Sequence, residues 1–580
     1  MKQTEWILKD CDRSISESMA EELEIPIPVA RILVGRNIKT ASEAAEFIEK
    51  PLKLLRSPKN LPDVDKAVQR LKTAIETEEK IFVWGDYDVD GITSTAIVAT
   101  CLKMFGANFI YKVPSRFADG YDIKRHSVDE CVKEKCSLLM SVDCGIVAFD
   151  TAEYAKRQNI DIIITDHHSA SEDGRIPDCV AVVNPSRKDS EYGFPGLCGA
   201  SVAFKLMTHL GRALGADINK IVAENLELVA LGTVADVAPM MDENRVLVAK
   251  GCELLSQSKK PGIQELLKII GVKEVDTTTI GFGIGPRLNA IGRLADPMIV
   301  VELLLEQNSQ RAKFLAQQTD AANKRRQLKQ EHMLEEAVSI VQDQKLDEMP
   351  LIVCWAKSWH SGLIGLIAGK LAEKYQRPAI VLALGDDGKA KGSCRSTRTV
   401  NILNILKHKD ALEFYGKKLD GSPIVGGHAF AAGMEVPESN LINFREQLCK
   451  IIVELNPEFA PGKIIYTADS RIVPGDINDQ LFDSLQGLAP FGSGHPEPVF
   501  WVRNLKVKEQ KYLSGGKHLK LTLESDKFKF KKVPGLLWHK ASDYSEDYTD
   551  KNVDILFSFG KESQNYGSKF YLNILDFKIS

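Results

Sequence analysis

The chain has 580 residues and a formal net charge of −4, and 44% of its residues are hydrophobic and 27% charged. This length predicts several domains, because a single core stops growing well before it, and the composition is that of a globular protein. No apolar run reaches the ~20 residues of a membrane span, and the N-terminus lacks a signal-peptide core, so we expect a cytoplasmic protein. Eleven cysteines without a Cys-x-x-Cys pair predict reduced thiols and argue against a zinc–thiolate site.

The first half of the chain alternates between helical and strand-like patterns. Residues 1–60 contain short helical patterns and carry no evident chemistry. A helical pattern from about residue 63 leads into the apolar run Ile81–Trp84, and residues 93–105 predict another helix. Further apolar runs follow at 108–113, 138–142 and 161–165. This alternation predicts a parallel sheet with crossover helices, in which functional sites lie at the carboxyl ends of the strands.

Three carboxylates, Asp86, Asp88 and Asp90, follow the first strand at alternate positions. They repel one another unless solvent or a cation compensates them, and oxygen clusters of this kind suit Mg²⁺ or Mn²⁺. A solvated acidic turn would show the same pattern. A calcium loop of the EF-hand type is excluded, because the twelfth residue of such a loop must be Glu and the residue at that place here is Ile97. A phosphatase of the aspartyl-phosphate type would use Asp88 and Asp90 as nucleophile and acid. The histidine pair further along the chain argues against this alternative, because such an enzyme does not need it.

Residues of ligand type also follow other strand-like runs. The run 138–142 is followed by Asp143, and the run 161–165 is followed by Asp166, His167 and His168. Asp236 follows a turn of small residues. Because parallel strands end at the same edge of a sheet, these side chains should gather there. The sequence therefore predicts a divalent-cation site.

These segments carry a family resemblance. Asp86-Tyr-Asp-Val-Asp-Gly91, Val142-Asp-Cys-Gly145, Asp166-His-His168 and Gly232-Thr-Val-Ala-Asp236 resemble the four motifs of the DHH phosphoesterase superfamily. Gly426-Gly-His-Ala-Phe-Ala-Ala-Gly433 resembles the glycine-rich signature of the companion DHHA1 domain. From about residue 60 to the C-terminus, the chain resembles the RecJ family of bacterial single-strand-specific 5′→3′ exonucleases.

The resemblance and the composition together predict an α/β protein with two α/β domains and an all-β barrel. Residues 300–344 contain neither glycine nor proline, which is typical of long helix. The expected parts are a lead segment 1–60, a DHH catalytic domain 61–297, a long connecting helix 298–346, a DHHA1 substrate-binding domain 347–462 and a barrel 463–580 that the resemblance implies is an OB-fold.

The last part has the composition of a nucleic-acid-binding surface. Alternating runs at 505–508, 519–523, 554–557 and 571–575 predict a small antiparallel barrel. Residues 503–532 hold ten Lys or Arg against three acids, with Tyr512, Phe528 and Phe530 between them. A basic strand surface with aromatic side chains suits single-stranded nucleic acid, which offers phosphates and unstacked bases.

The resemblance implies hydrolysis of single-stranded DNA from its 5′ end with release of 5′-mononucleotides, in DNA repair and recombination. It also implies two divalent cations, Mn²⁺ or Mg²⁺, held by Asp88, Asp90, Asp143, His167 and Asp236, with Asp143 as the bridging carboxylate. Asp86, Asp166 and His168 are implied catalytic residues near the metals, and three roles stay open for them: contact with a metal, contact with substrate phosphate, or hydrogen bonds that orient the ligands.

The implied substrate-binding residues are rich in glycine and in side chains that bind phosphate. Glycines let backbone N–H groups approach a phosphate, and the planar fork of Arg binds two phosphate oxygens. We expect Arg116, Ser393 and Arg395 to bind a terminal 5′-phosphate, although surface arginines are common and a structural role stays open. The full set is Arg116, Arg287, Asn289, Arg293, His360, Ser393, Arg395, Gly426, Gly427 and His428.

Two alternative functions stay open. One is hydrolysis of short oligoribonucleotides or cyclic dinucleotides. Members of the superfamily with that activity resemble only the two central domains of this chain. The basic C-terminal block of about 110 residues argues against it. The other is a non-catalytic single-strand-binding replication factor, against which the complete ligand set argues. The expected partners are single-stranded DNA and, as candidates, a single-strand-binding protein and a helicase; we expect a monomer without membrane association.

Overall fold

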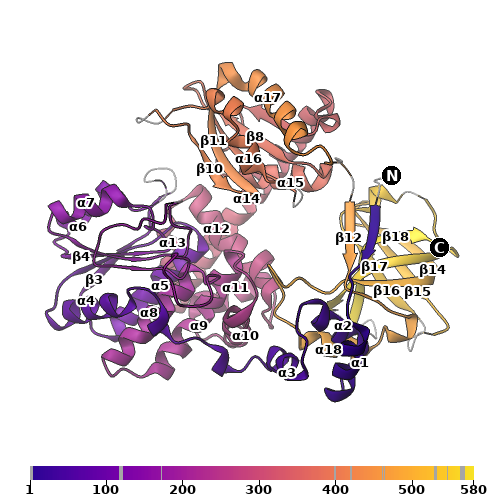
Figure 1. Ribbon diagram of the computed structural model, residues 1–580, viewed down its shortest axis with the longest axis horizontal. Coiled ribbons are helices and arrows are strands. Elements are labelled where there is room, and N and C mark those ends of the chain that lie inside the picture. The colour runs from indigo at the N-terminus through magenta and orange to yellow at the C-terminus, as the bar shows by residue number, and fades with distance from the viewer. Residues whose placement is uncertain are drawn as a thin grey trace. The chain divides into compact units, whose positions relative to one another are not determined.

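The computed structural model describes residues 4–115, 120, 122–171, 173–397, 400–417, 421–459, 462, 464–527, 532–544, 546–561 and 569–580 (Figure 1). Arg116, Phe528 and Phe530, which the sequence singled out, lie outside these residues. The chain forms two compact units. One comprises residues 8–323 and 468–580, and the other comprises residues 324–467 together with the chain up to Ile7.

The first unit contains the five-stranded sheet that the alternating pattern predicted. Its strand order is β3-β2-β4-β5-β6, and every neighbouring pair is parallel. Four strands match the expected apolar runs, and β6 is an additional short strand. The strands are β2 (Ile81–Trp84), β3 (Phe109–Lys112), β4 (Leu138–Val142), β5 (Asp161–Thr165) and β6 (Ala181–Val183).

Apolar side chains cover both faces of this sheet, which explains why β2 and β4 are buried at every position. One face packs on α5 (Val89–Met104) and α8 (Gly199–Ala213), together with α4 (Val64–Glu76) and α9 (Ile218–Ala235). The other face packs on α6 (Arg125–Lys133) and α7 (Phe149–Arg157). The sheet therefore lies between two helical layers, and its carboxyl-end edge is left to the loops.

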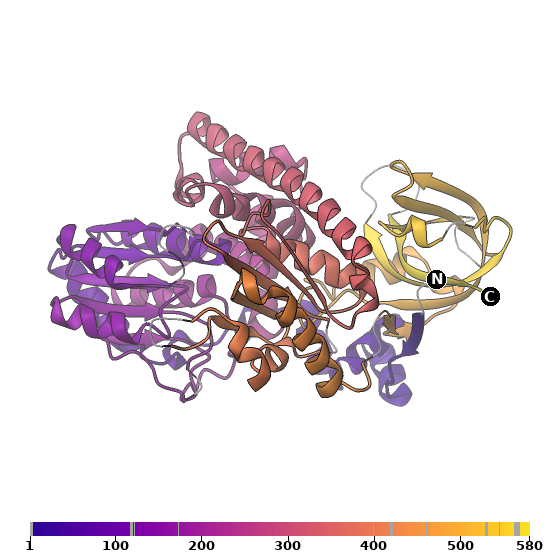
Figure 2. The same cartoon turned by 90° about the horizontal axis from the view of Figure 1, so that it is seen from above.

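The helical sequence after the sheet is less regular than expected. Helices α10 (Asp242–Ser256) and α11 (Pro261–Ile270) precede a π-helix, η3 (Thr279–Ile284), which continues into α12 (Gly285–Leu294). The single helix expected over 298–346 is divided into α13 (Met298–Leu305) and α14 (Ser309–Asp343) (Figure 2).

The interruption between α13 and α14 has a local cause. The Glu306 side chain accepts hydrogen bonds from the backbone N–H groups of Gln307 and Asn308, and the Asn308 side chain accepts them from Gln310 and Arg311. These side chains replace helical carbonyls as acceptors, so one helix ends and the next begins. Among the described residues, no helix combines the length and the apolar content that crossing a membrane requires.

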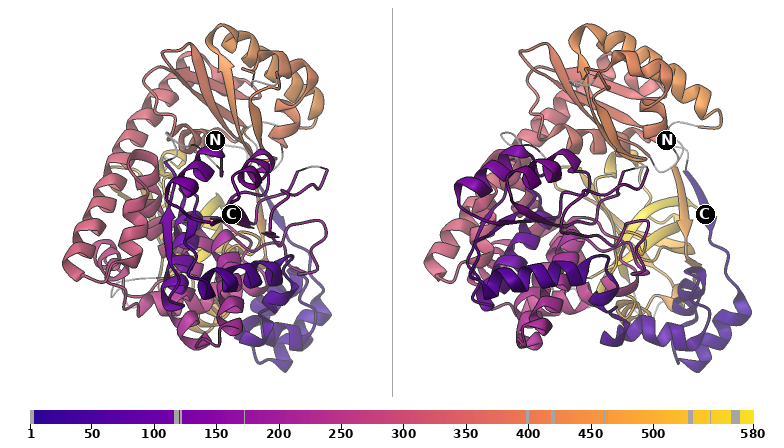
Figure 3. Two further views of the ribbon diagram at one scale, coloured as in Figure 1. Left: turned by 90° about the vertical axis from the view of Figure 1, so that its left-hand side faces the viewer. Right: turned by 60° about the vertical axis from the view of Figure 1, so that its left-hand side comes forward.

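The second unit is built on a mixed sheet of order β10-β11-β9-β8-β7. Only the pair β7–β8 is parallel. The unit also includes most of a two-stranded sheet, in which β1 (Thr4–Leu8) lies beside β12 (Ile464–Ala468) (Figure 3). The remaining elements are β7 (Ile352–Ala356), α15 (Ile364–Tyr375), β8 (Ala379–Leu384), β9 (Lys389–Arg395), α16 (Ile402–Leu406), β10 (Val425–His428), β11 (Ala431–Pro437) and α17 (Leu441–Leu455).

The C-terminal part of the first unit is a barrel, as predicted, but it is not wholly antiparallel, because β13 pairs with β14 and β16 pairs with β18 in parallel. Its strand order is β13-β14-β15-β16-β18-β17, and the pairing of β14 with β17 closes it. All four expected alternating runs are strands, and β16 was missed because Pro534 and Gly535 interrupt its pattern. The elements are β13 (Ser470–Arg471), α18 (Asp479–Gln486), β14 (Phe500–Leu513), β15 (His518–Glu524), β16 (Val533–Leu537), β17 (Asn552–Lys561) and β18 (Phe570–Ile579).

The N-terminal helices pack on this barrel, which the sequence did not predict. Helices α1 (Arg13–Glu22), α2 (Ile27–Gly35) and α3 (Ala41–Glu49) share one hydrophobic core with α18 and the barrel strands. In this core, Ile32 and Leu33 are buried together with Leu481 and Phe482. The first helices are therefore a structural part of the C-terminal domain.

Two isoleucines on α2 test this shared core. Ile32 is 1% exposed and Ile27 is 44% exposed. We expect Ile32→Ala to lower the free energy of unfolding by about 2–5 kcal/mol, because it leaves a cavity, whereas Ile27→Ala should cost less than about 1 kcal/mol. Chemical denaturation followed by a probe in the barrel measures both. Equal effects of the two substitutions would contradict the shared core.

Candidate metal centre

The loop after β2 is folded so that its acidic side chains point in fixed directions. Asp88 caps α5, because its Oδ1 accepts hydrogen bonds from the backbone N–H groups of Asp90 at 2.9 Å and Gly91 at 3.1 Å. A Cβ at position 91 would lie 2.5 Å from the backbone oxygen of Asp86, so this tight turn requires glycine. Asp86 and Asp90 are both buried. The chain thus presents three acids from one strand–helix turn.

The ends of β4 and β5 supply the next residues. Asp143 directly follows β4, has a left-handed backbone (φ 64°) and is buried. Its N–H group donates to the carbonyl of Thr165 at the end of β5, which keeps the two strand tips together. Asp236 ends α9 as its C-terminal cap, so the segment of small residues before it is the end of a helix and not the expected turn. The candidate ligands therefore come from strand ends and from one helix end.

His167 lies at the centre of this group. Its Nε2 is 3.2 Å from Asp143 Oδ1, 3.7 Å from Asp90 Oδ2 and 3.8 Å from Asp236 Oδ2. Among the described residues, Asp143 Oδ1 and His167 Nε2 are buried and make no hydrogen bond. Buried polar atoms are rarely left in this way, and an oxygen and an imidazole nitrogen that face each other suit a shared cation.

Three overlapping sets of side chains offer ligand atoms within 4.8 Å of one another. Asp143 belongs to two of the sets, and so does His167. The donors are carboxylate oxygens and imidazole nitrogens, which suit Mn²⁺ and Mg²⁺. The sets are Asp86, Asp88 and Asp143; Asp90, His167 and Asp236; and Asp143, His167 and His168.

Asp166 has a different role in the same loop. Its Oδ1 accepts hydrogen bonds from the N–H groups of His167 and His168 and lies 2.8 Å from His168 Nδ1, and its Oδ2 accepts one from the N–H of Ile146. Both carboxylate oxygens are thus engaged inside the protein. The residue orients the backbone of both histidines and the ring of His168.

The electrostatics of the site favour a bound cation. Burial, followed by repulsion from Asp90, Asp88 and Asp86, raises the pKa of Asp143 well above its usual range. Burial and repulsion from Asp90 and Asp88 raise the pKa of Asp236 to about 8. Carboxylates in this position resist simultaneous ionisation, and a positive charge among them removes the resistance.

The two histidines are shifted in opposite directions. Burial lowers the pKa of His167, which favours the neutral imidazole that ligates metals. Burial also lowers the pKa of His168, but the hydrogen bond and the charge of Asp166 outweigh it and raise that pKa to about 9. Burial thus disfavours protonation of His167, whereas Asp166 favours protonation of His168.

The amino end of α8 holds one of the acids, a contact that the sequence analysis missed. The N–H groups of Gly199 and Ala200 donate to the two oxygens of Asp90, at 2.6 and 2.9 Å. A Cβ at Gly199 would lie 2.5 Å from Asp143 Oδ1, and a Cβ at Gly232 would lie 2.6 Å from Asp90 Oδ1. The helix dipole favours this negative charge, and both glycines leave room for it.

Three substrate-binding candidates lie on α12, and Arg287 has partners within the protein. Arg287 forms an ion pair with Asp320 of α14 at 2.9 Å and donates to the carbonyl of Gly283. Asn289 and Arg293 are half-buried on the same helix. A Cβ at Gly292 would lie 2.7 Å from the backbone oxygen of Tyr87, so α12 packs directly against the Asp86–Gly91 loop.

The other candidates gather on the sheet of the second unit. Register places Ser393 of β9 opposite Gly433 of β11, which lies opposite Gly426 of β10. In the same way, Arg395 lies opposite Ala431, which lies opposite His428. The sheet thus aligns these residues in two adjacent rows.

Side-chain contacts within the second unit hold these candidates in place. Arg395 Nη1 donates to the carbonyl of Cys394 at 2.8 Å and to Ser393 Oγ at 3.3 Å, so its guanidinium is fixed on β9. Gly426, Gly427 and His428 are exposed on β10. His360 precedes α15, and its Nδ1 accepts from the N–H of Gly362.

Comparison with known proteins covers all three domains. The DHH family, N-terminal domain, matches residues 80–233; the DHHA1 domain matches 348–454; and the RecJ OB domain matches 468–576. The chain is 33% identical over 528 residues to the single-stranded-DNA-specific exonuclease RecJ of Escherichia coli (strain K12), which covers 88% of this chain and 89% of that protein. The chain belongs to the RecJ family.

A second RecJ protein, from Bacillus subtilis (strain 168), is 34% identical over 528 residues, which cover 90% of this chain. The chain spans 64% of the length of that relative. The fold resembles the crystal structure of RecJ from Thermus thermophilus in complex with Mn²⁺, with a TM-score of 0.82 and 26% identity over all of this chain and 80% of the other. RecJ from that organism is also known in complex with Mg²⁺, with a TM-score of 0.75.

Gly199 offers a test of how the ligands are positioned. We expect Gly199→Ala to lower the affinity for Mn²⁺ by about 10–100-fold, because the new methyl group displaces Asp143 and disturbs the contact of α8 with Asp90. Isothermal titration of the full chain, after removal of bound metal with chelator, measures this affinity.

The control is Gly211→Ala on the same helix, where the added Cβ would meet Cδ1 of Ile221, the movable end of a side chain. This substitution should alter thermal stability without altering Mn²⁺ affinity. Equal losses of affinity in the two variants would show that the effect of Gly199→Ala comes from general damage to α8.

Proposed function

We propose that this chain is a single-stranded-DNA-specific exonuclease that hydrolyses phosphodiester bonds from the 5′ end and releases 5′-mononucleotides, in DNA repair and recombination. The observation that carries the proposal is the complete group of carboxylate and imidazole ligands around His167, in a chain that also has the RecJ OB domain. Metal ligands supply the chemistry, and a barrel supplies affinity for a long strand.

We propose two divalent cations, Mn²⁺ or Mg²⁺, with Asp88, Asp90, Asp143, His167 and Asp236 as ligands. Such ions neutralise phosphoryl oxygens and lower the pKa of bound water. Asp143 is suited to bridging because it belongs to two of the ligand sets. Asp86 lies in one of these sets, Asp166 fixes the histidines, and His168 offers a positively charged Nε2–H to a phosphate oxygen.

On the substrate side, Ser393, Arg395 and the exposed edge Gly426–His428 are proposed to bind the terminal phosphate and the strand behind it. The fixed guanidinium of Arg395 presents a planar fork, and the glycines leave backbone groups accessible. Arg287 and Arg293 are proposed to support the strand near α12, although Arg287 already pairs with Asp320. His360, Asn289 and Arg116 complete the proposed set.

The barrel offers cationic and aromatic groups that favour a polymer over a short oligoribonucleotide or a cyclic dinucleotide. The guanidinium groups of Arg471 and Arg503 lie 5.7 and 4.9 Å from the centre of the Trp501 ring. Tyr512 is 44% exposed. Bases of a single strand stack on such groups. The presence of every expected metal ligand disfavours the alternative of a non-catalytic replication factor. We propose that the enzyme is a monomer and that its partners are a single-strand-binding protein and a helicase.

The first test uses single strands labelled at either end. With Mn²⁺, the 5′ label should appear in mononucleotides before the 3′ label, and chelator should stop the reaction. Asp143→Ala should reduce turnover by several orders of magnitude, whereas Asp150→Ala, which removes an exposed acid nearby in sequence, should leave it unchanged. Mononucleotides that appear first from the 3′ end, or cleavage in chelator, would contradict the proposal.

The second test concerns the terminal phosphate. Arg395→Ala should remove a charge-assisted contact of about 1.5–3 kcal/mol, which is a loss of roughly 10–150-fold in kcat/KM on 5′-phosphorylated strands. The loss should be much smaller on 5′-hydroxyl strands. Lys391→Ala removes an exposed positive charge from the same strand, β9, and is the matched control. An equal loss on both kinds of end would place the phosphate elsewhere.

A further inference from the structure

A cavity of about 770 Å³ lies within the first unit, between the catalytic domain and the barrel domain. On one side it is bounded by α10 and the chain at the start of η3, and on the other by α18, the loop that precedes β14, and strands β17 and β18. Its volume is in the range of sites that hold drug-sized ligands or a few side chains. None of the metal ligands lines it.

The charges of the lining are the opposite of what nucleic acid requires. Glu253, Asp276 and Glu497 contribute carboxylates. Of the described lining residues, Lys561 alone carries a positive charge, and its ammonium is already paired with Glu274. A phosphate backbone would be repelled from this cavity, and a cationic group would be attracted.

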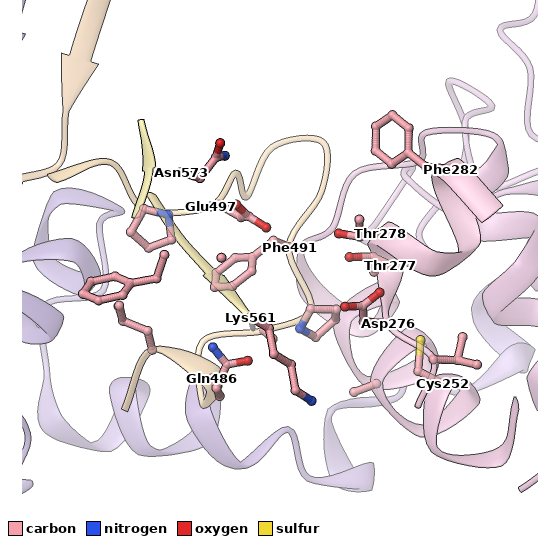
Figure 4. A pocket seen from close by; sticks show the side chains of 18 of the residues that line it. Cys252, Asp276, Thr277, Thr278, Phe282, Gln486, Phe491, Glu497, Lys561 and Asn573 are labelled. Atoms are coloured by element: carbon pink, nitrogen blue, oxygen red, sulfur yellow. The ribbon is translucent and has the colours of Figure 1, made fainter. Parts of the chain in front are cut away.

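Two of the carboxylates face each other across the space. Figure 4 shows the side chains of Asp276 and Glu497 directed into the cavity from opposite walls. Asp276 is held there because its Oδ1 accepts hydrogen bonds from both N–H and Oγ1 of Thr279. Loss of water around Glu497 raises its pKa, a hydrogen bond with Ser558 partly offsets this rise, and repulsion from Asp276 adds to it. A cation between these two groups would relieve that repulsion.

Aromatic side chains flank the acidic pair. Phe491 lines the cavity, and Phe282 lies beside it on η3 with 83% of its surface exposed (Figure 4). A large apolar side chain so exposed, next to a cavity, is typical of the residues that anchor a protein partner. Isolated π-helical turns also occur preferentially at functional sites.

We propose that this cavity is a docking site for a segment of a partner protein that combines a basic with an aromatic or apolar side chain. A Lys or Arg side chain enters between Asp276 and Glu497, and the neighbouring apolar side chain packs on Phe282 and Phe491. The negative charge of the lining selects a cationic group. Phe282 lies at the edge of the cavity and can contact a peptide side chain, whereas a small free cation would make no contact with it. The proposal is independent of the exonuclease activity.

The test measures binding of a fluorescein-labelled hexapeptide of alternating Arg and Trp to the full chain by fluorescence anisotropy at physiological salt. A peptide of alternating Glu and Trp is the charge-inverted probe. Two variants remove the proposed contacts. Phe282→Ala removes the apolar anchor, and Asp276→Asn with Glu497→Gln removes both charges, while Asn keeps an oxygen that can accept from Thr279.

We expect the basic peptide to bind the wild type, and each variant to weaken binding at least tenfold with unchanged exonuclease turnover. The matched control, Glu17→Gln with Asp150→Asn, removes the same charge from exposed positions outside the cavity and should leave binding within twofold of the wild type.

Several outcomes would overturn the proposal. They are binding of the acidic peptide with equal affinity and an equal loss in the control. Displacement by an equal concentration of spermidine would identify a small-cation site instead. Concentration-dependent dimers that the Phe282→Ala variant abolishes would identify a second copy of the chain as the occupant.

Discussion

Mutual repulsion among buried carboxylates is the constraint on which the rest of this structure depends. Asp86, Asp90 and Asp143 are all at most 3% exposed, and they lie at neighbouring strand ends. Acids so close together cannot keep their charge without fixed donors or a cation. The fold supplies backbone donors to Asp90 from the amino end of α8, to Asp88 from the amino end of α5 and to Asp166 from its own turn. These contacts fix part of the ligand geometry, whereas Asp143 Oδ1 and His167 Nε2 make no hydrogen bond with any described residue and are suited to a cation.

Most of the candidate metal centre could be predicted from the sequence because its geometry follows from chain direction. In a parallel sheet all carboxyl ends lie at one edge, so Asp86 to Asp90 after β2, Asp143 after β4 and the residues after β5 had to be neighbours. The contact of Asp90 with Gly199 could not be predicted in this way. It joins residues 109 positions apart, and a glycine at the start of a helix is common for other reasons. The only sequence signal for this contact was Gly199, a glycine directly before an apolar helical pattern.

Other features were missed because local pattern does not contain them. The composition of residues 300–344 favours helix throughout, but the side chains of Glu306 and Asn308 compete for backbone N–H groups and divide it. Arg287 has the residue type of a phosphate ligand, yet the proximity of Asp320 gives it an intramolecular partner. The helical pattern of the first 60 residues was clear, whereas its packing partner lies more than 400 residues away and leaves no mark on that pattern.

The shared core of the N-terminal helices and the barrel has a consequence for biosynthesis. Helix α2 leaves the ribosome well before α18 and the barrel strands that cover its apolar face, which are made more than 400 residues later. At the usual rate of translation, of order 5–20 residues per second, Ile32 and Leu33 wait roughly 20–110 s for their partners, while the sheet of the DHH domain between them is completed. The N-terminal helices then depend on chaperones or on transient contacts for protection, and a chain whose synthesis stops before α18 leaves them exposed for proteolysis.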